Sequence, residues 1–271
     1  MPLALVWPGF LSGAILALLL LQKGVAYTAA MAALAAALLA GIGAIVGLAV
    51  PAALANAATV WVPVALLTAI LMRSRSLALT LQLAFVLTVS GLLLFHAVVD
   101  DPLAFWRGQL ASVVDAMRAS GNYEQADLFA NDAVLVNMTM VSALVVFCIT
   151  VVGTVLGYRL YRALPGNDAV CGRFRDFGYG RILALATALV SLIAWLGGFA
   201  PMQELAFVMF AMFWLQGLAI AHWSHGQGFL PTFGLVAMYV LAPLLNAVLM
   251  IGLAITGYLD AWFGFRRLKT V

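Results

Sequence analysis

The sequence predicts an all-α fold, a polytopic bundle of about eight transmembrane helices with one amphipathic interfacial helix. Of the 271 residues, 66% are hydrophobic and only 8% are charged, and the mean hydropathy is +1.12. A soluble globular chain carries about a quarter charged residues, so this composition cannot cover a water-exposed surface. The apolar runs are long enough to cross a bilayer, and lipid offers an open sheet no hydrogen-bond partners, so they are expected to be helices. These observations predict an integral membrane protein.

The apolar runs divide the chain into spans that we expect to form one transmembrane domain over residues 1–271. The third span follows the second without a polar loop, so Pro51 would have to lie in the first turn of its helix. The expected spans lie near 3–21, 25–50, 51–72, 77–99, 133–157, 182–200, 205–221 and 231–259.

The charges between the spans predict the orientation. One side carries eight Lys or Arg against two Asp, and the other carries five against eight acidic residues, which gives +6 and −3. Because loop cations are retained in the cytoplasm, the side that holds the loop at 158–181 is predicted to be cytoplasmic and the segment 100–132 external. The basic stretch 266–269 then falls outside, unless a re-entrant or merged segment follows residue 182. The net charge of +3 is too small to indicate nucleic-acid binding.

The segment 100–132 is the only long polar stretch, and its apolar residues recur at helical spacing. Gly121-Asn122 would end that helix. The pattern predicts an amphipathic helix on the membrane surface, either a connector that caps the bundle or a lid over a binding cavity. The recurring apolar residues are Leu103, Trp106, Leu110, Val113, Val114 and Met117.

Neutral polar residues are the candidates for a binding site, because no charged residue falls inside the spans as drawn. Pumps and ion-coupled carriers usually place a charged group there. In lipid each neutral polar side chain needs a hydrogen-bond partner, either another helix or a bound substrate. Gly217 is expected to open space beside the amide of Gln216. The candidate substrate-binding residues are Gln216, Asn246, Asn56, Gln82 and Asn137.

Two other features indicate contacts with lipid or with a partner protein. Ala29, Ala33 and Ala37 repeat every four residues, which lets helix backbones approach closely inside the bundle or against another protein. Charged residues in the 158–181 loop and near the C-terminus could contact anionic headgroups or a partner, or could serve as ordinary positive-inside anchors. These are Arg173, Arg175, Asp260, Arg266 and Arg267.

The sequence holds no recognisable catalytic or metal-binding motif, so we expect no enzymatic activity, no catalytic residue, no metal and no cofactor. His222 and His225 share a helical face, and His96 and Asp100 are four residues apart, but the expected topology separates the two pairs. The positions of the two cysteines give no reason to expect a disulfide or a zinc site.

Two C-terminal stretches resemble the YybS-type family of bacterial polytopic membrane proteins, whose domain has no known function. They are Leu215-Gln216-Gly217-Leu218-Ala219 and the stretch from Gly257 through Asp260 and Trp262 to Arg267. The family's terminal pattern has a second Asp where this chain has Gly264, so a pair of acting carboxylates is not implied here. The resemblance implies the bacterial cytoplasmic (inner) membrane. It also implies a distant similarity to the substrate-capture subunits of energy-coupling-factor transporters, and hence a small bundle with a ligand cavity.

These observations favour a membrane protein that binds or transports a small organic molecule or a lipid within the helical bundle. The alternative is a non-enzymatic membrane scaffold that assembles other proteins, which the alanine repeat and the basic loop would serve. The expected partners are the lipid bilayer, a small-molecule or lipid ligand and another membrane protein, and no nucleic acid.

Overall fold

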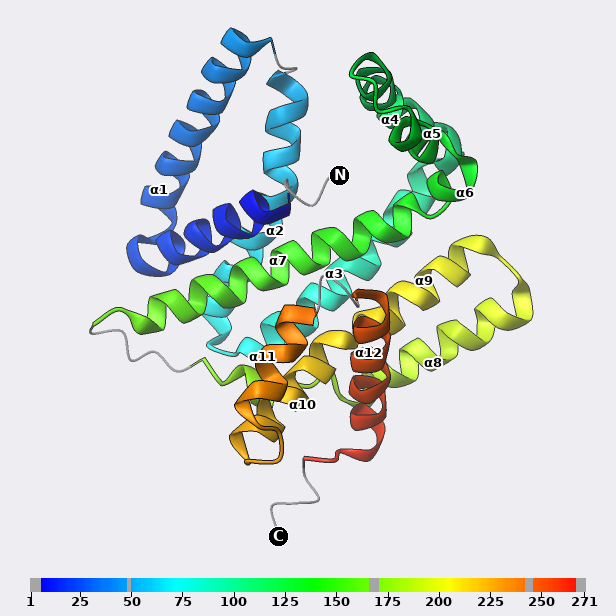
Figure 1. Ribbon diagram of the computed structural model, residues 1–271. Helices are drawn as coiled ribbons and strands as arrows, with labels where there is room; N and C mark the ends of the chain where they lie inside the picture. Colours follow the sequence, from blue (N-terminus) through cyan, green and yellow to red (C-terminus); the bar gives the residue numbers. More distant parts are fainter. Residues whose placement is uncertain (1–5, 48–49, 166–170, 242–245, 267–271) are drawn as a thin grey trace. The chain divides into compact units, whose positions relative to one another are not determined.

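The computed structural model describes residues 6–47, 50–165, 171–241 and 246–266 (Figure 1). Across these residues the regular structure is helical, with no strand. The chain divides into two compact units, which we treat separately. Unit 1 comprises residues 1–85 with 146–177, and unit 2 comprises residues 86–145 with 178–271.

Unit 1 is built on helices that meet through small residues. Gly24, at φ +79°, interrupts the regular helical backbone of α1. A Cβ on Gly153 would lie 3.4 Å from the Cα of Gly13, and one on Gly157 would lie 2.7 Å from the carbonyl oxygen of Ala14. Small residues thus allow α1 and α7 to approach closely. The elements of unit 1 are α1 (Val6–Val46), α2 (Val50–Ser74), the first part of α3 (Leu77–Val98), most of α7 (Met138–Ala163) and the short 3₁₀ helix η2 (Phe174–Asp176).

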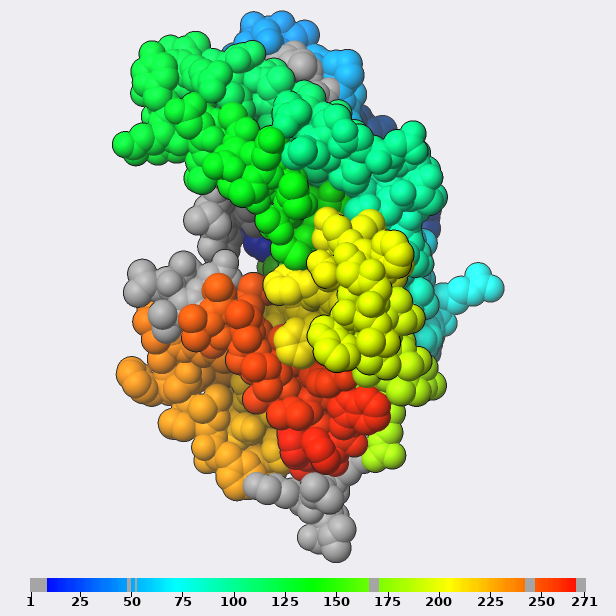
Figure 2. Space-filling model, turned by 90° about the vertical axis from the view of Figure 1, so that its right-hand side faces the viewer, coloured from blue at the N-terminus to red at the C-terminus, as the bar shows by residue number. Residues whose placement is uncertain are grey.

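Unit 2 contains the remaining helices. Gly198, in the left-handed region at φ +64°, ends α8 and lets α9 return along it. Helix α12 packs against α10, α8 and α9, and Figure 2 shows α9 (yellow) beside α12 (red). The elements are the end of α3, α4 (Pro102–Ala119), α5 (Tyr123–Ala130), α6 (Asp132–Leu135), the start of α7, α8 (Gly180–Gly197), α9 (Ala200–Ala211), α10 (Trp214–Gly226), α11 (Thr232–Leu241) and α12 (Asn246–Phe263).

The expectation of several membrane-spanning helices is confirmed in its coarse form. Among the described residues, six helices are long and apolar enough to cross a bilayer. The count of eight differs because the first two expected spans are joined in α1, and because the last expected span corresponds to two shorter apolar helices, α11 and α12. Pro243 lies outside the described residues. The six are Gly9–Val46, Ala53–Ser74, Leu77–Val98, Met138–Ala163, Gly180–Gly197 and Ala200–Gly226.

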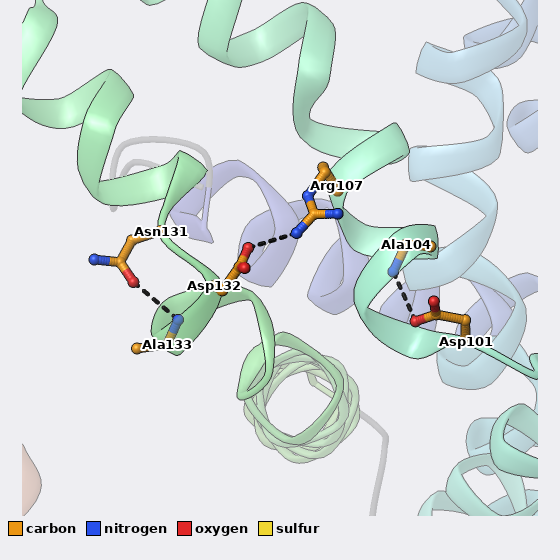
Figure 3. Close-up of polar contacts among 6 residues, drawn as sticks. All are labelled: Asp101, Ala104, Arg107, Asn131, Asp132 and Ala133. Carbon is orange, nitrogen blue, oxygen red and sulfur yellow. Dashed lines mark hydrogen bonds and ion pairs between the residues drawn. The ribbon is translucent and has the colours of Figure 1, made fainter.

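The polar segment after α3 folds into α4, α5 and α6 (Figure 3). Asp101 caps α4, because its Oδ1 accepts a hydrogen bond of 2.9 Å from the Ala104 N–H. The predicted stop is confirmed, since α4 ends at Ala119 and Gly121 adopts φ +80°. Part of the apolar face of α4 packs within the protein, with Val114 buried and Trp106 Nε1 donating to Thr139 Oγ1 at 2.8 Å. A position on the membrane surface stays a prediction for α4.

Candidate functional site

The candidate site lies where α10 meets α12 in unit 2. A side chain at Gly217 would run into the backbone of Leu253, and one at Gly257 would run into the Phe213 carbonyl. Glycine at both positions therefore allows the two backbones to touch. The expectation that Gly217 opens space beside the Gln216 amide is wrong, because the backbone of α12 occupies that space.

Gln216 is 1% exposed, and both ends of its amide bond to protein groups. Its Nε2 donates to Asp260 Oδ2 over 2.8 Å. Its Oε1 accepts a hydrogen bond of 2.8 Å from the backbone N–H of Tyr179, which directly precedes α8. These two partners fix which end of the amide carries the oxygen. Gln216 thus ties α10 to α12 and to the start of α8.

Asp260 is a charged residue inside a helix, only 4% exposed. Its Oδ2 accepts a second hydrogen bond, of 2.8 Å, from Arg266 Nη2, whose side chain is 15% exposed. Its Oδ1 is buried and has no hydrogen-bond partner among the described residues. The structure therefore corrects two expectations. The apolar helix continues past residue 259 and includes a charge, and Asp260 pairs with Arg266 in the interior instead of facing lipid or a partner.

Gln216, Asp260, Arg266 and the Tyr179 backbone form what we call the polar cluster. Three aromatic rings pack together on the same elements: the centroid of Phe213 lies 5.1 Å from that of Tyr179 and 5.2 Å from that of Tyr258. Gln216 and Asp260 are themselves buried, and hydrogen bonds between charged and polar groups are stronger away from water. Burial also raises the pKa of the Tyr179 phenol. The cluster can therefore hold a carboxylate, a guanidinium and an amide in fixed positions inside an apolar unit.

Gly178 makes room for one member of the polar cluster. A Cβ at this position would lie 3.0 Å from Arg266 Nη2 and 3.6 Å from Gln216 Nε2. The residues that follow α12 are thereby held against the segment that leads into α8. Arg266 thus occupies a defined place at this end of unit 2.

The other predicted binding residues lie elsewhere. Asn56 is exposed on α2 and Gln82 is half-buried on α3, both in unit 1. Asn137 is exposed between α6 and α7, and its Nδ2 donates to the Ala133 carbonyl over 2.8 Å. It therefore precedes the membrane-spanning helix, which corrects its expected place inside a span. Asn246 is the first residue of α12, and its side chain lies outside the description.

The three histidines contact residues outside the spacing pairs seen in the sequence. His96, at the end of α3, contacts Glu204 of α9 with Nε2 and Oε2 3.2 Å apart. His222 Nε2 lies 2.7 Å from the Tyr239 hydroxyl, and His225 Nδ1 lies 2.9 Å from the Leu230 carbonyl. In the described part of the chain, no three His, Cys, Asp or Glu side chains are grouped to hold a metal ion.

The basic loop before α8 keeps its predicted contact residues near the surface. Arg173 is exposed. Arg175 is half-buried, and its Nε lies 4.0 Å from Asp176 Oδ1. Arg267, the last predicted contact residue, lies outside the described residues.

Comparison with known proteins returned no match: no protein family, no curated protein and no solved structure matches this chain.

Proposed function

We propose that the chain is a polytopic membrane protein that binds or transports a small organic molecule or a lipid within its helical bundle. The polar cluster supports this proposal. Ligand sites are usually apolar with a few fixed polar groups, and Gln216 and Asp260 form such a set among apolar and aromatic side chains. Buried ionisable groups are costly in apolar surroundings and commonly mark functional sites in membrane proteins. The proposal includes no enzymatic step and no cofactor.

The proposed topology has about eight apolar spans in a bacterial inner membrane, with the YybS-type family as the proposed relative. One of the spans after residue 182 is re-entrant and does not cross the membrane. The loop at 158–181 lies in the cytoplasm and the segment 100–132 outside. Contact between Arg266 and the residues just before α8 supports one change, a C-terminus on the same side as the loop. With the C-terminal charges included, that side holds eleven Lys or Arg against three Asp, and the other holds two against seven acidic residues.

One observation favours the scaffold alternative. The second half of α1, residues 25–46, exposes apolar side chains along its length, with Ile45 88% exposed. The repeat Ala29, Ala33, Ala37 lies on an exposed face of this helix, where another membrane helix could approach closely.

The molecules that copurify with the protein distinguish ligand binding or transport from the scaffold function. We would purify the full chain in mild detergent, extract it, and compare the extract with bulk membrane by mass spectrometry. The variants are Gln216→Leu and Asp260→Asn, with Gln203→Leu as the matched control because Gln203 is exposed on α9. We expect one molecule enriched with the wild type and the control, and lost from both cluster variants. Copurification of a protein without any enriched small molecule would support the scaffold instead.

A further inference from the structure

The polar cluster contains one oxygen whose hydrogen-bonding capacity is unused. Both donors to the Asp260 carboxylate, Gln216 Nε2 and Arg266 Nη2, bond to Oδ2. Oδ1 is buried without a partner among the described residues, and Asp260 as a whole is 96% buried, given its exposed fraction of 4%. Buried polar atoms are normally satisfied, so an anionic oxygen left without a donor requires an explanation.

We propose that Oδ1 of Asp260 is a proton-binding site, and that a proton and the guanidinium of Arg266 compete for this carboxylate. With Arg266 in place, two charge-assisted hydrogen bonds on Oδ2 stabilise the ionised form. When a proton binds Oδ1, the carboxyl group becomes neutral, and its charge attraction for the partly exposed guanidinium is lost. The hydrogen bond from Arg266 to Oδ2 is then weaker, and Arg266 moves toward solvent.

The position of Arg266 makes this exchange physically possible. It lies beyond the last residue of α12, and its side chain is already 15% exposed, so it can reach solvent without unwinding the helix. Asp260 is held within α12 and cannot follow. Proton binding at Asp260 and release of the Arg266 side chain are therefore linked, and each favours the other by the same free energy.

The other titratable side chains on the elements that pack against α12 have contacts of their own. On α9, Glu204 pairs with His96, and on α10 the two histidines contact Tyr239 and the Leu230 carbonyl. Tyr258 on α12 donates to the Ala184 carbonyl at 3.4 Å.

Two further groups lie at the start of α8. There Tyr179 offers its backbone N–H to Gln216, and Arg181 is exposed. The described hydrogen bonds of the Asp260 carboxylate itself come from Gln216 and Arg266.

The proton site rests on the proposed function for its purpose, which is to couple binding or transport to proton uptake, but its test needs no ligand. We would record infrared difference spectra of the full chain in lipid vesicles between neutral and acidic pH. The carbonyl stretch of a protonated carboxylic acid is the signal. We expect one component of this signal to be absent from Asp260→Asn, and to appear at higher pH in Arg266→Gln, which removes the competing charge. Asp127→Asn is the control. Asp127 Oδ1 also lies near an arginine, 3.1 Å from Arg118 Nη2, but it is exposed, so this variant should keep the component that Asp260→Asn lacks.

Arg266→Gln keeps the test decisive even where Asp260→Asn fails to fold, since residue 266 lies at the partly exposed end of the cluster. A carboxyl signal with the same pH dependence in the wild type and in Arg266→Gln would overturn the proposal. So would an acid difference spectrum of folded Asp260→Asn identical to that of the wild type. Loss of a copurified ligand at neutral pH is a separate measurement, so the proposed function and the proton site can fail independently.

Discussion

Gly257 of α12 lies against the carbonyl of Phe213 in α10, so closely that a methyl group on Gly257 would overlap it. The same contact fixes the distance between the two helices that carry Gln216 and Asp260. The polar cluster therefore depends on residues that have no side chain.

Gly257→Ala is expected to push α10 and α12 apart and to destabilise the protein by about 1–3 kcal/mol, the usual cost of overpacking a close contact. Gly252→Ala is the matched control on the same helix, since a Cβ at Gly252 meets no atom within 4 Å. Alanine is the better helix former, so the control should be neutral or more stable by roughly 0.5–1 kcal/mol. Thermal unfolding in detergent measures both, and equal behaviour of the two variants would contradict the contact.

Gln216→Leu removes one donor to Asp260 and the acceptor for the Tyr179 N–H. Loss of the acceptor for the buried Tyr179 N–H should cost about 1–3 kcal/mol, seen as a lower unfolding temperature. Loss of one of the two donors to Asp260 should lower that temperature further, because only Arg266 then donates to Oδ2. Asn56→Leu, at an exposed site, should leave it nearly unchanged. An unaltered unfolding temperature in Gln216→Leu would mean that these hydrogen bonds contribute little to stability.

Labelling of single cysteines tests the proposed sides of the membrane. In a background without Cys148 and Cys171, we would place cysteine at Ala119 within the external segment, at Ala163 at the end of α7, and at Phe265. A reagent that cannot cross the membrane should label only Ala119→Cys in intact cells. Labelling of Phe265→Cys from outside would show that the C-terminus is not on the side of the 158–181 loop.

The pair His96 and Glu204 joins α3 to α9 from partly buried positions, with side chains 14% and 15% exposed. Glu204→Gln and His96→Gln should each destabilise the protein. A double-mutant cycle should give a coupling energy of roughly 1.5–3 kcal/mol, the range of hydrogen bonds to charged groups. A coupling energy near zero would mean that His96 and Glu204, although 3.2 Å apart, do not stabilise the protein through this contact.

The exposed end of α4 offers a comparison between a cap and an ion pair (Figure 3). Asp101→Ala removes the cap and should cost about 1 kcal/mol. Arg107 Nη2 lies 2.7 Å from Asp132 Oδ1, and this hydrogen bond raises the pKa of the Arg107 guanidinium, but both side chains are exposed. Arg107→Gln should therefore have a small effect that disappears in high salt. A loss of stability in Arg107→Gln that does not depend on salt would contradict the expectation that the cap contributes more than the ion pair.

Local signals in the sequence predicted helix boundaries well. Pro51 lies in the first turn of α2, and α4 ends just before Gly121, because proline and glycine act on their own backbone. The position of Asp260 inside α12 was not predicted, for a different reason. Hydropathy treats a charge as the end of a span, whereas Asp260 is held within α12 by partners 44 residues away at Gln216 and six away at Arg266.

Contacts between residues far apart in the chain could not be predicted from the sequence either. The contact between His96 and Glu204 joins residues 108 positions apart, and no local spacing indicates it. Asn137 was placed inside a span because the residues around it are apolar, yet α7 begins only at Met138. Both cases depend on how helices end and meet, which periodicity does not determine.

The break at Gly24 has a consequence for the path of α1 through lipid. A continuous α-helix over Gly9–Val46, which is 38 residues, would measure about 57 Å at 1.5 Å per residue, nearly twice the thickness of a hydrocarbon core. Departure from helical geometry at Gly24 removes backbone hydrogen bonds around it, and Thr28 Oγ1 supplies one replacement by donating to the Gly24 carbonyl at 2.9 Å. Lipid supplies no others, so Lys23 and Gly24 belong where headgroups or water can complete the backbone hydrogen bonding. We therefore expect α1 to reach the membrane surface midway along its length and to enter the bilayer again.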